Sequence, residues 1–338
     1  MPKKITFIKF FVFSAIILIL LTYRDFLYTI KLMNYHFYNF KMLPLDPYYQ
    51  IILKIDGLID KNFRFPWEWR LIPNYINWLF YEFLPCFKPK AIPTQVNGAT
   101  YCAIWSISLV NFLSGICSQL LIAYYVLNKL NRNHVECISL IFVSYFLIKF
   151  LDPFGVDRIS FLFLIIFLFF TETRYAYFFI LISILINDKC LLFITTYYFA
   201  KNFDFNNLHK MFRELKLLLS GILSIFYLTY ISTTIFNITS SEVSYNYLNF
   251  HSLVNSIIPT IVVIFGFIYN FNNKELLRSF NLKKSYIFFI IIFSLLGFFV
   301  GGPGNFGRYI VFGSLLFFPI LNFQIIEFIK KYLTKLNS

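Results

Sequence analysis

Charged residues are scarce in this sequence. Asp, Glu, Lys and Arg together make up 14% of its 338 positions, whereas hydrophobic residues make up 59%. Soluble domains carry about a quarter charged residues, and this chain also contains several apolar runs long enough to cross a bilayer. These two observations exclude a soluble globular domain and predict an all-α, polytopic helical membrane protein.

Acidic residues are the scarcer of the two signs. The chain has 16 Asp and Glu against 30 Lys and Arg, which gives a net charge of +14. In a soluble protein this excess would suggest binding to nucleic acid, but Lys and Arg also flank membrane helices on the cytoplasmic side. No basic patch with RNA-binding patterning accompanies the charge. We therefore predict membrane lipid, and no nucleic acid, as a partner.

Cysteine and histidine lack the spacing of metal sites. The sequence has no CxxC pair, and its four histidines show no ligand spacing to one another. No zinc site and no cofactor is predicted, and a divalent cation held by external carboxylates stays an open alternative. We interpret the five cysteines as small core residues rather than a disulfide framework; they are Cys86, Cys102, Cys117, Cys137 and Cys190.

The apolar runs predict a single integral membrane domain over 1–338. The first run lacks a small-x-small cleavage site before Thr22, so we interpret it as a retained helix and not as a signal peptide. The run 72–84 rises only about 20 Å as a helix, which predicts an interfacial or re-entrant helix inside a first external loop at 23–97. The remaining bundle occupies 98–338, and the runs expected to cross are 5–21, 100–127, 137–151, 159–170, 175–186, 190–200, 217–236, 252–269, 287–300 and 309–328.

The distribution of Lys and Arg predicts the orientation. With the N-terminus in the cytoplasm and one crossing per run, the short outer loops hold only Arg158, Lys189 and Arg308. This asymmetry predicts about ten crossings with both termini cytoplasmic, in a bacterial inner membrane. The segment 175–200 is either one helix with Asp188 buried or a hairpin of two short helices. The hairpin keeps the parity that the downstream charges require, and we favour it.

This orientation gathers the ionisable candidates on the non-cytoplasmic face. Ionisable groups are costly near a bilayer, so their gathering at one side is what an active site opening to that side requires. The candidate catalytic residues are Asp25 and Asp46. The candidate substrate-binding residues are Tyr49, Arg70, Asp157, Arg158, Asp188, Lys189, Asn305 and Arg308.

The element Asp46-Pro-Tyr-Tyr49 places a carboxylate ahead of a short expected helix. A carboxylate that faces a cavity at the membrane edge can act as general base on an acceptor hydroxyl. Asp followed by Pro is also a favoured helix start, so a helix N-cap is the competing interpretation. Asp25, just beyond the first expected helix, is a competing base, or it pairs with Arg24 at the interface.

Three further elements offer groups for a phosphate. Arg70-Leu-Ile-Pro73 places a guanidinium, which suits bidentate contacts with phosphate, directly before the interfacial helix. The break Asp152-Pro-Phe-Gly-Val-Asp-Arg158 either lines a cavity or is a turn in which Asp157 and Arg158 cap the next helix. The glycine-rich Gly301-Gly-Pro-Gly-Asn-Phe-Gly-Arg308 either binds phosphate through backbone N–H groups or is a flexible hairpin.

Together these elements resemble bacterial polytopic glycosyltransferases of the GT-C type, in particular a group linked to cell-surface glycopolymer formation. The resemblance is carried by Asp46-Pro-Tyr-Tyr49, Trp69-Arg70-Leu-Ile-Pro73, the 152–158 break and the late external Arg308. It implies a polyprenyl-phosphate-linked sugar as donor and a glycan, lipid or protein acceptor on the outer face. It further implies that Asp46 is the general base and that Arg70 and Arg308 are the phosphate partners.

Two other functions compete with a glycosyltransferase. An O-antigen-type polymerase, or another polysaccharide-assembly protein, would favour a large second external loop rich in Arg, whereas the longest external stretch here is the first. A transporter or lipid flippase would require charges that face each other at mid-membrane and two repeated halves. Lys149 is the clear basic residue deep in an apolar run, and we find no convincing internal repeat.

Overall fold

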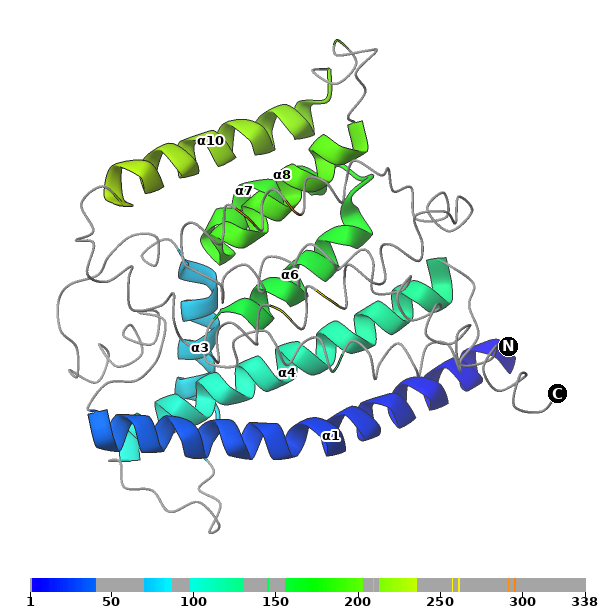
Figure 1. The fold of residues 1–338 in the computed structure, drawn as a ribbon. Helices are drawn as coiled ribbons and strands as arrows, with labels where there is room; N and C mark the ends of the chain where they lie inside the picture. The colour runs from blue at the N-terminus through cyan, green and yellow to red at the C-terminus, as the bar shows by residue number, and fades with distance from the viewer. Residues whose placement is uncertain are drawn as a thin grey trace. The chain divides into compact units, whose positions relative to one another are not determined.

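The structure is a computed structural model, and its description covers five stretches of the chain. These are 2–40, 70–86, 98–129, 156–202 and 213–235, together with the isolated positions 145, 209, 257, 261, 291 and 295. Within these stretches the chain is helical and contains no strand (Figure 1), which confirms the all-α class. Apart from such isolated positions, the expected runs 137–151, 252–269, 287–300 and 309–328 lie outside the described residues.

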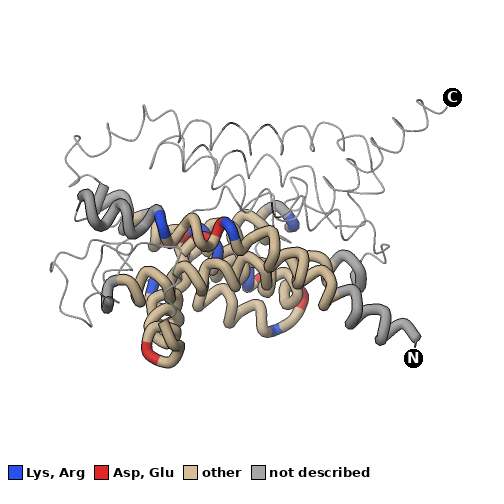
Figure 2. The backbone as a smooth tube through the Cα atoms, turned by 90° about the horizontal axis from the view of Figure 1, so that it is seen from below, with Lys and Arg blue, Asp and Glu red and all other residues tan. Residues whose placement is uncertain are grey.

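Two of the described helices are long and apolar enough to cross a membrane. The candidate spans are Phe11–Lys31, with mean hydropathy 1.7, and Tyr101–Tyr125, with mean hydropathy 1.6. Ala176–Ile186 and Leu215–Tyr227 are shorter apolar helices. Charged residues are sparse along the described helices (Figure 2). These features indicate association with a membrane.

Helix α1, Pro2–Phe40, is longer than expected. We predicted that it ends at position 21 and that an external loop begins at 23, and both expectations are wrong for the stretch up to Phe40. Arg24 and Asp25 interrupt the apolar run, but neither breaks a helix, and no Pro or Gly occurs between Ile5 and Phe40. The helix therefore continues through these positions, with Arg24 exposed and Asp25 partly exposed.

The chain divides into two compact units. The first contains 1–121, 152–166 and 182–188, and the second contains 122–151, 167–181 and 189–338. In the first unit, α1 runs beside α4, Gly98–Lys129, and the rings of Phe26 and Phe112 lie 5.2 Å apart (Figure 1). Of the two candidate spans, the one in α4 is 67% buried and the one in α1 only 11%, so α4 is the inner helix of this pair.

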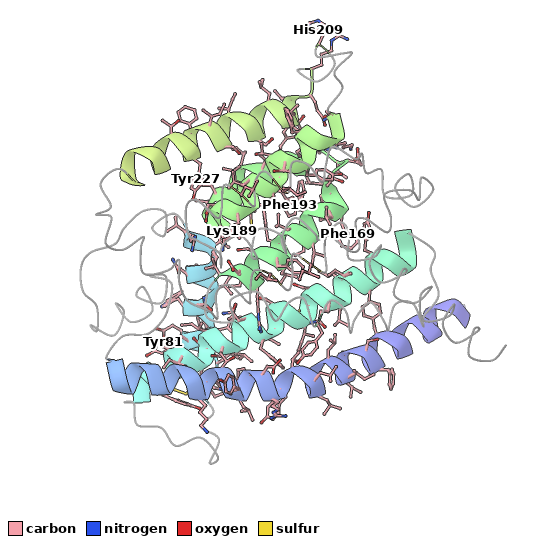
Figure 3. All side chains as sticks on the ribbon, viewed as in Figure 1. Tyr81, Phe169, Lys189, Phe193, His209 and Tyr227 are labelled. Carbon is pink, nitrogen blue, oxygen red and sulfur yellow. A yellow bond between two sulfur atoms is a disulfide. The ribbon has the colours of Figure 1, made fainter. Side chains whose placement is uncertain are left out.

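The short helix expected over 72–84 is confirmed as α3, Leu71–Phe83. It stands across the direction of α1 and α4 (Figure 1). Tyr81, near its C-terminal end, packs against a buried cluster that includes Ile30 of α1 and Ile104 of α4 (Figure 3). This contact anchors the C-terminal end of α3 on the α1–α4 pair.

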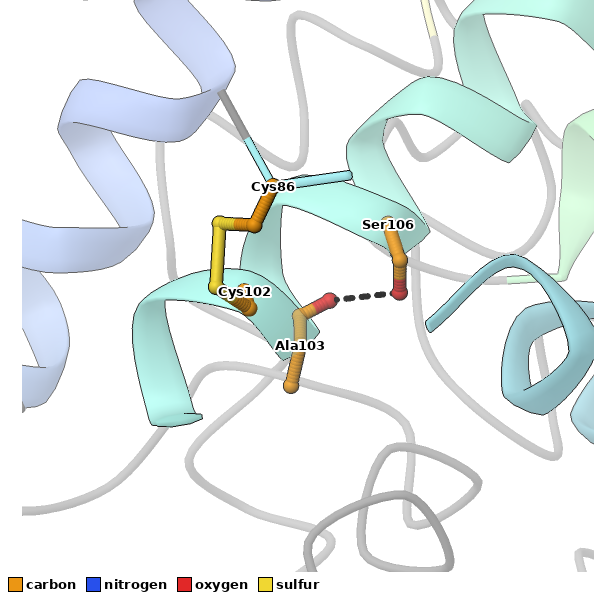
Figure 4. Close-up of a disulfide and its surroundings, with 4 residues drawn as sticks. All are labelled: Cys86, Cys102, Ala103 and Ser106. Atoms are coloured by element: carbon orange, nitrogen blue, oxygen red, sulfur yellow. Dashed lines mark hydrogen bonds between the residues drawn. A yellow bond between two sulfur atoms is a disulfide. The ribbon is translucent and has the colours of Figure 1, made fainter. Parts of the chain in front are cut away.

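A disulfide joins Cys86, which follows α3, to Cys102 in α4 (Figure 4). Our interpretation of the cysteines as unpaired core residues is therefore wrong for this pair. Their spacing of 16 residues fits no disulfide or metal motif, and the pair forms because the chain turns back so that the two Cα atoms lie 5.4 Å apart. Cys190 is buried, as expected for a small core residue, and Cys117 is an exposed free cysteine.

Helices α7, Ala176–Ile186, and α8, Asp188–Asn202, form the hairpin that we favoured. The Tyr198 hydroxyl of α8 donates a hydrogen bond of 3.1 Å to the carbonyl oxygen of Thr171, which precedes α7. The C-terminal half of α8 therefore lies beside the start of α7, and a single continuous helix is excluded. The two helices are separated only by Asn187, a residue type favoured just before a helix.

Two further helices complete the described fold. Of the expected break at 152–158, the described part begins at Val156 and leads into α6, Asp157–Phe170, whose first turn contains Asp157. Helix α10, Leu215–Ile235, lies beside α8 (Figure 1), and the Thr195 hydroxyl contacts both the carbonyl of Ser220, at 3.1 Å, and the hydroxyl of Ser224. Hydroxyl pairs of this kind are a common form of contact between membrane helices.

Candidate functional site

A buried ion pair in the first unit marks the candidate site. The Nη2 atom of Arg70 donates a hydrogen bond of 2.8 Å to Oδ1 of Asp188, and the two side chains are only 7% and 11% exposed. Arg70 directly precedes α3, and Asp188 is the first residue of α8. The contact therefore brings together two sequence-predicted site residues that lie 118 positions apart.

The cost of burial makes this pair informative. Removing two charges from water often costs as much free energy as their attraction returns, so a buried pair is a weak source of stability. Asp188 also lies in the first turn of α8, where the helix dipole favours a carboxylate. In an otherwise apolar chain, a retained buried pair of this kind is a candidate for function.

The start of α6 meets the same turn between α7 and α8. The amide of Asn187 donates a hydrogen bond of 2.9 Å to the hydroxyl of Ser160, which in turn donates one of 2.7 Å to the carbonyl of Val156. Asp157, one turn before Ser160, is buried. Asp157 and Arg158 thus lie in the first turn of α6, and Ser160 of the same helix contacts the turn that carries Asp188.

The buried face of α3 adds two amides that sequence reasoning missed. Asn74 and Asn77 are 3% and 0% exposed. Among the described residues, none forms a hydrogen bond with either side-chain amide. We read both asparagines only as interruptions of an apolar run. The signal was their spacing, because Arg70, Asn74 and Asn77 follow the helical period and so share one face of α3.

The other predicted site residues fall in different places. Asp25 lies inside α1 and inside the candidate span, so our placement of it in a loop is wrong. Arg158 is partly buried in the first turn of α6. Lys189 is 7% exposed in the first turn of α8 and belongs to the second unit (Figure 3). Four predicted site residues lie outside the described part of the chain: Asp46, Tyr49, Asn305 and Arg308.

A second polar cluster lies at the other end of the α7–α8 hairpin, in the second unit. Lys201 forms an ion pair with Glu172, and the amide of Asn202 donates to the carboxylate of Glu214. The Lys216 ammonium donates a hydrogen bond of 3.1 Å to the carbonyl of Thr171. These contacts join the ends of α8 and α10 to the turn before α7, which fits a structural role.

The pKa of Glu214 lies above its ordinary range. Burial is the main cause, because it disfavours the charged carboxylate, and the neighbouring Glu172 adds to it. Lys201 and Lys216 act in the opposite direction but do not reverse the shift.

The described residues contain no cluster of three or more His, Cys, Asp or Glu side chains that could hold a metal ion. The charged groups at the starts of α3, α6 and α8 are instead Arg70, which pairs with Asp188, and the buried Asp157, with several neutral polar side chains. A guanidinium binds phosphate and amides bind hydroxyls, and in this structure the carboxylate of Asp188 balances the charge of Arg70.

Comparison with known proteins gives no match. The chain matches no family model, no curated protein and no solved structure at a significant level. The resemblance to GT-C glycosyltransferases therefore stands on the short motifs of the sequence alone.

Proposed function

We propose that the protein is a multi-pass membrane glycosyltransferase of the GT-C type. It would transfer a sugar from a polyprenyl-phosphate donor to a glycan, lipid or protein acceptor on the outer face of a bacterial inner membrane, as part of cell-envelope polysaccharide biosynthesis. The observation that carries the proposal is the buried Arg70–Asp188 pair at the starts of α3 and α8. Buried ionisable groups in membrane helices are functional sites by default, because their desolvation is costly.

The roles follow from the chemistry of each group. Arg70 binds the donor phosphate, and Asp188 holds the guanidinium in position. Asp46, with Asp25 as the alternative, removes the proton of the acceptor hydroxyl as its oxygen bonds to the anomeric carbon of the sugar. The bond between that carbon and the phosphate oxygen breaks, and polyprenyl phosphate leaves with its negative charge stabilised by Arg70 and Arg308.

The disulfide supports the proposed orientation independently of the charge distribution. Disulfides persist in oxidising compartments and are rare in the cytosol. Cys86 lies at the end of the segment that we assign to the outer face, and Cys102 lies near the N-terminal end of α4. An outer position for both residues agrees with about ten crossings and cytoplasmic termini.

The test replaces the two candidate bases in cells whose own gene is deleted. Wild type, Asp46→Asn and Asp25→Asn are expressed separately, surface glycans are compared by mass spectrometry, and protein levels by immunoblot. We expect Asp46→Asn alone to abolish one glycan, by at least about 100-fold, because general-base catalysis contributes roughly 10²–10⁴-fold. Unchanged glycans in both variants at normal protein levels would remove the base assignment.

A transporter or lipid flippase is the second candidate, because of the α7–α8 hairpin. Its helices of 11 and 15 residues are short and meet at a polar turn, and interrupted helices of this kind often line substrate sites in transporters. Purified protein in sealed vesicles separates the two. A glycosyltransferase forms a glycosylated product when donor and acceptor are on the same side, whereas a flippase moves the donor across the bilayer and forms none.

A further inference from the structure

We propose that Asn74 and Asn77 form the subsite for the sugar of the donor, next to Arg70. This inference rests on the proposed function, since it assigns the neighbouring group of the same lipid-linked substrate. Nothing in the sequence motifs points to these two residues. The proposal comes from their burial and from their hydrogen-bonding state.

Both amides are buried, and neither has a hydrogen-bond partner among the residues that the structure describes. Asn74 and Asn77 are 3% and 0% exposed, and the nitrogen and oxygen of each side chain lack a hydrogen bond within the described structure. Buried polar groups nearly always have a partner, because an amide removed from water loses its hydrogen bonds. Two such side chains on one helix face therefore have hydrogen-bonding capacity that no described residue satisfies, and a bound molecule can satisfy it.

Their position fits the group attached to a bound phosphate. Leu71 and Tyr75, on the other side of α3, are 53% and 60% exposed, whereas Arg70, Asn74 and Asn77 are buried. From Arg70 the helix advances about 6 Å to Asn74 and about 10 Å to Asn77. In a polyprenyl-phosphate sugar the ring is bonded directly to the phosphate, so its hydroxyls lie on the path between these residues.

The chemistry of the amide selects the kind of ligand. Each asparagine offers two N–H donors and a carbonyl acceptor, which is the complement of a hydroxyl that both donates and accepts. A second phosphate needs donors only, and the carbonyl oxygens would repel it. A cation needs acceptors only. Two asparagines beside an arginine therefore suit a neutral, hydroxyl-bearing group linked to an anion.

Ordered water is the competing occupant. A buried water also bonds to two or more otherwise unsatisfied polar groups. The two explanations predict different ligand preferences. If the amides bind only water, the protein should bind a polyprenyl phosphate equally well with and without its sugar. The experiment therefore measures that preference.

Full-length protein in nanodiscs is titrated with a polyprenyl-phosphate hexose and, separately, with the same polyprenyl phosphate lacking the sugar. Wild type is expected to bind the sugar-bearing lipid about tenfold more tightly. One or two additional hydrogen bonds to otherwise unsatisfied amides account for a difference of this size. Asn74→Leu and Asn77→Leu should each lose most of this preference while keeping the affinity for the sugar-free lipid. Tyr75→Leu, on the exposed face of the same helix, is the matched control and should keep both affinities.

The affinity for the sugar-free lipid and the melting temperature show whether a variant is correctly folded. Leu has the same number of side-chain heavy atoms as Asn, branched at the same carbon, and it removes the unsatisfied amide, so both variants should melt at or above the Tm of wild type. Loss of preference with an unchanged or higher Tm supports the subsite. Full retention of the preference in both variants means that water alone occupies the amides, and it overturns the inference.

The proposed function can fail separately. If wild type binds the two lipids equally, the sugar subsite is wrong and the phosphate site at Arg70 stands. If wild type binds neither lipid, the proposed function is wrong and the subsite falls with it. Arg70→Gln helps to separate these results, because it should weaken both lipids alike.

Discussion

At the scale of single residues, buried polarity is the feature on which the proposed function rests. Arg70, Asn74 and Asn77 are all buried in a chain whose composition is dominated by apolar side chains. Asp188 joins them through its ion pair with Arg70. Each of these groups loses hydration on burial, so the site is maintained at a cost to stability. Such local costs are typical of functional sites.

Exchanging the charges of Arg70 and Asp188 separates structure from function. Breaking a buried pair costs about 3–5 kcal/mol, because one charge is left without its partner. Arg70→Asp and Asp188→Arg alone should therefore lower the Tm strongly, and the double variant should recover a large part of the loss. We expect the double variant to remain unable to restore the surface glycan, since the guanidinium then extends from a different helix. A restored glycan would mean that the pair has a structural role only.

Glu214 provides a prediction about pH. Its pKa in the folded chain is raised, mainly by burial, so the folded chain favours the protonated carboxyl. The stability from this group is fully present below its ordinary pKa and is lost as the pH rises through the higher folded value. Glu214→Gln, which cannot ionise, should melt roughly 1–3 °C above wild type near neutral pH. The difference in Tm should vanish below about pH 4, where the Glu214 carboxyl of wild type is also protonated.

Thermal unfolding of purified protein across this pH range checks the prediction. Glu82→Gln is the control, because Glu82 is exposed and its substitution should leave the pH dependence unchanged. A difference that grows as the pH falls would contradict the assignment.

At the scale of secondary-structure elements, some features could be read from the sequence and others could not. The apolar run 100–127 gave α4, and the polar Asn187-Asp-Lys189 correctly divided α7 from α8. Hydropathy did not give the end of α1, because charged residues alter hydropathy without interrupting helical hydrogen bonds. The pairing of Cys86 with Cys102 depends on the return of the chain from α3 to α4, which no local pattern contains.

The candidate site also has residues that could be predicted from the sequence and contacts that could not. Arg70 and Asp188 were identified because charges are rare in apolar runs, and topology predicted a common face for them. Their direct contact could not be predicted, since it depends on how α3 and the α7–α8 turn pack. Asn74 and Asn77 were missed because a neutral amide in a short apolar run also suits an interfacial helix, whose outer side is polar.

The disulfide should stabilise the connection between α3 and α4. Closing a loop of about this size in the unfolded chain contributes about 3 kcal/mol. Reduction, or Cys86→Ser with Cys102→Ser, should therefore lower the Tm by several degrees, and Cys117→Ser, at an exposed free cysteine, should not. Thermal unfolding with and without reductant measures the effect. Equal Tm values in the two states would show that the bridge does not hold α3.

At the scale of the whole molecule, the proposal depends on which side of the membrane each segment occupies. The described residues include two helices of spanning length, and the ten-crossing arrangement rests on charge distribution. Under this arrangement, α3 faces the outside and the turn between α6 and α7 faces the cytoplasm. Both segments contain exposed positions that can be labelled, Glu82 and Arg174.

Cysteine labelling tests this arrangement directly. Glu82→Cys and Arg174→Cys are made separately in a chain whose Cys117, Cys137 and Cys190 are replaced by Ser. A membrane-impermeant maleimide should label position 82 in intact cells and position 174 only after the membrane is opened. Labelling of both from the outside would overturn the topology and, with it, the extracytoplasmic reaction.

The length of α1 bears on the acceptor. Its span Phe11–Lys31 covers about 31 Å, close to the thickness of the hydrocarbon layer, so the residues from 32 to Phe40 project about 13 Å beyond it. Asp25 then lies about 9 Å inside the hydrocarbon boundary. A base at that depth reaches only an acceptor whose hydroxyl enters the lipid phase, whereas a base beyond Phe40 serves a hydrophilic chain in solution. The choice between Asp25 and Asp46 is thereby also a choice between a lipid and a glycan as the molecule that receives the sugar.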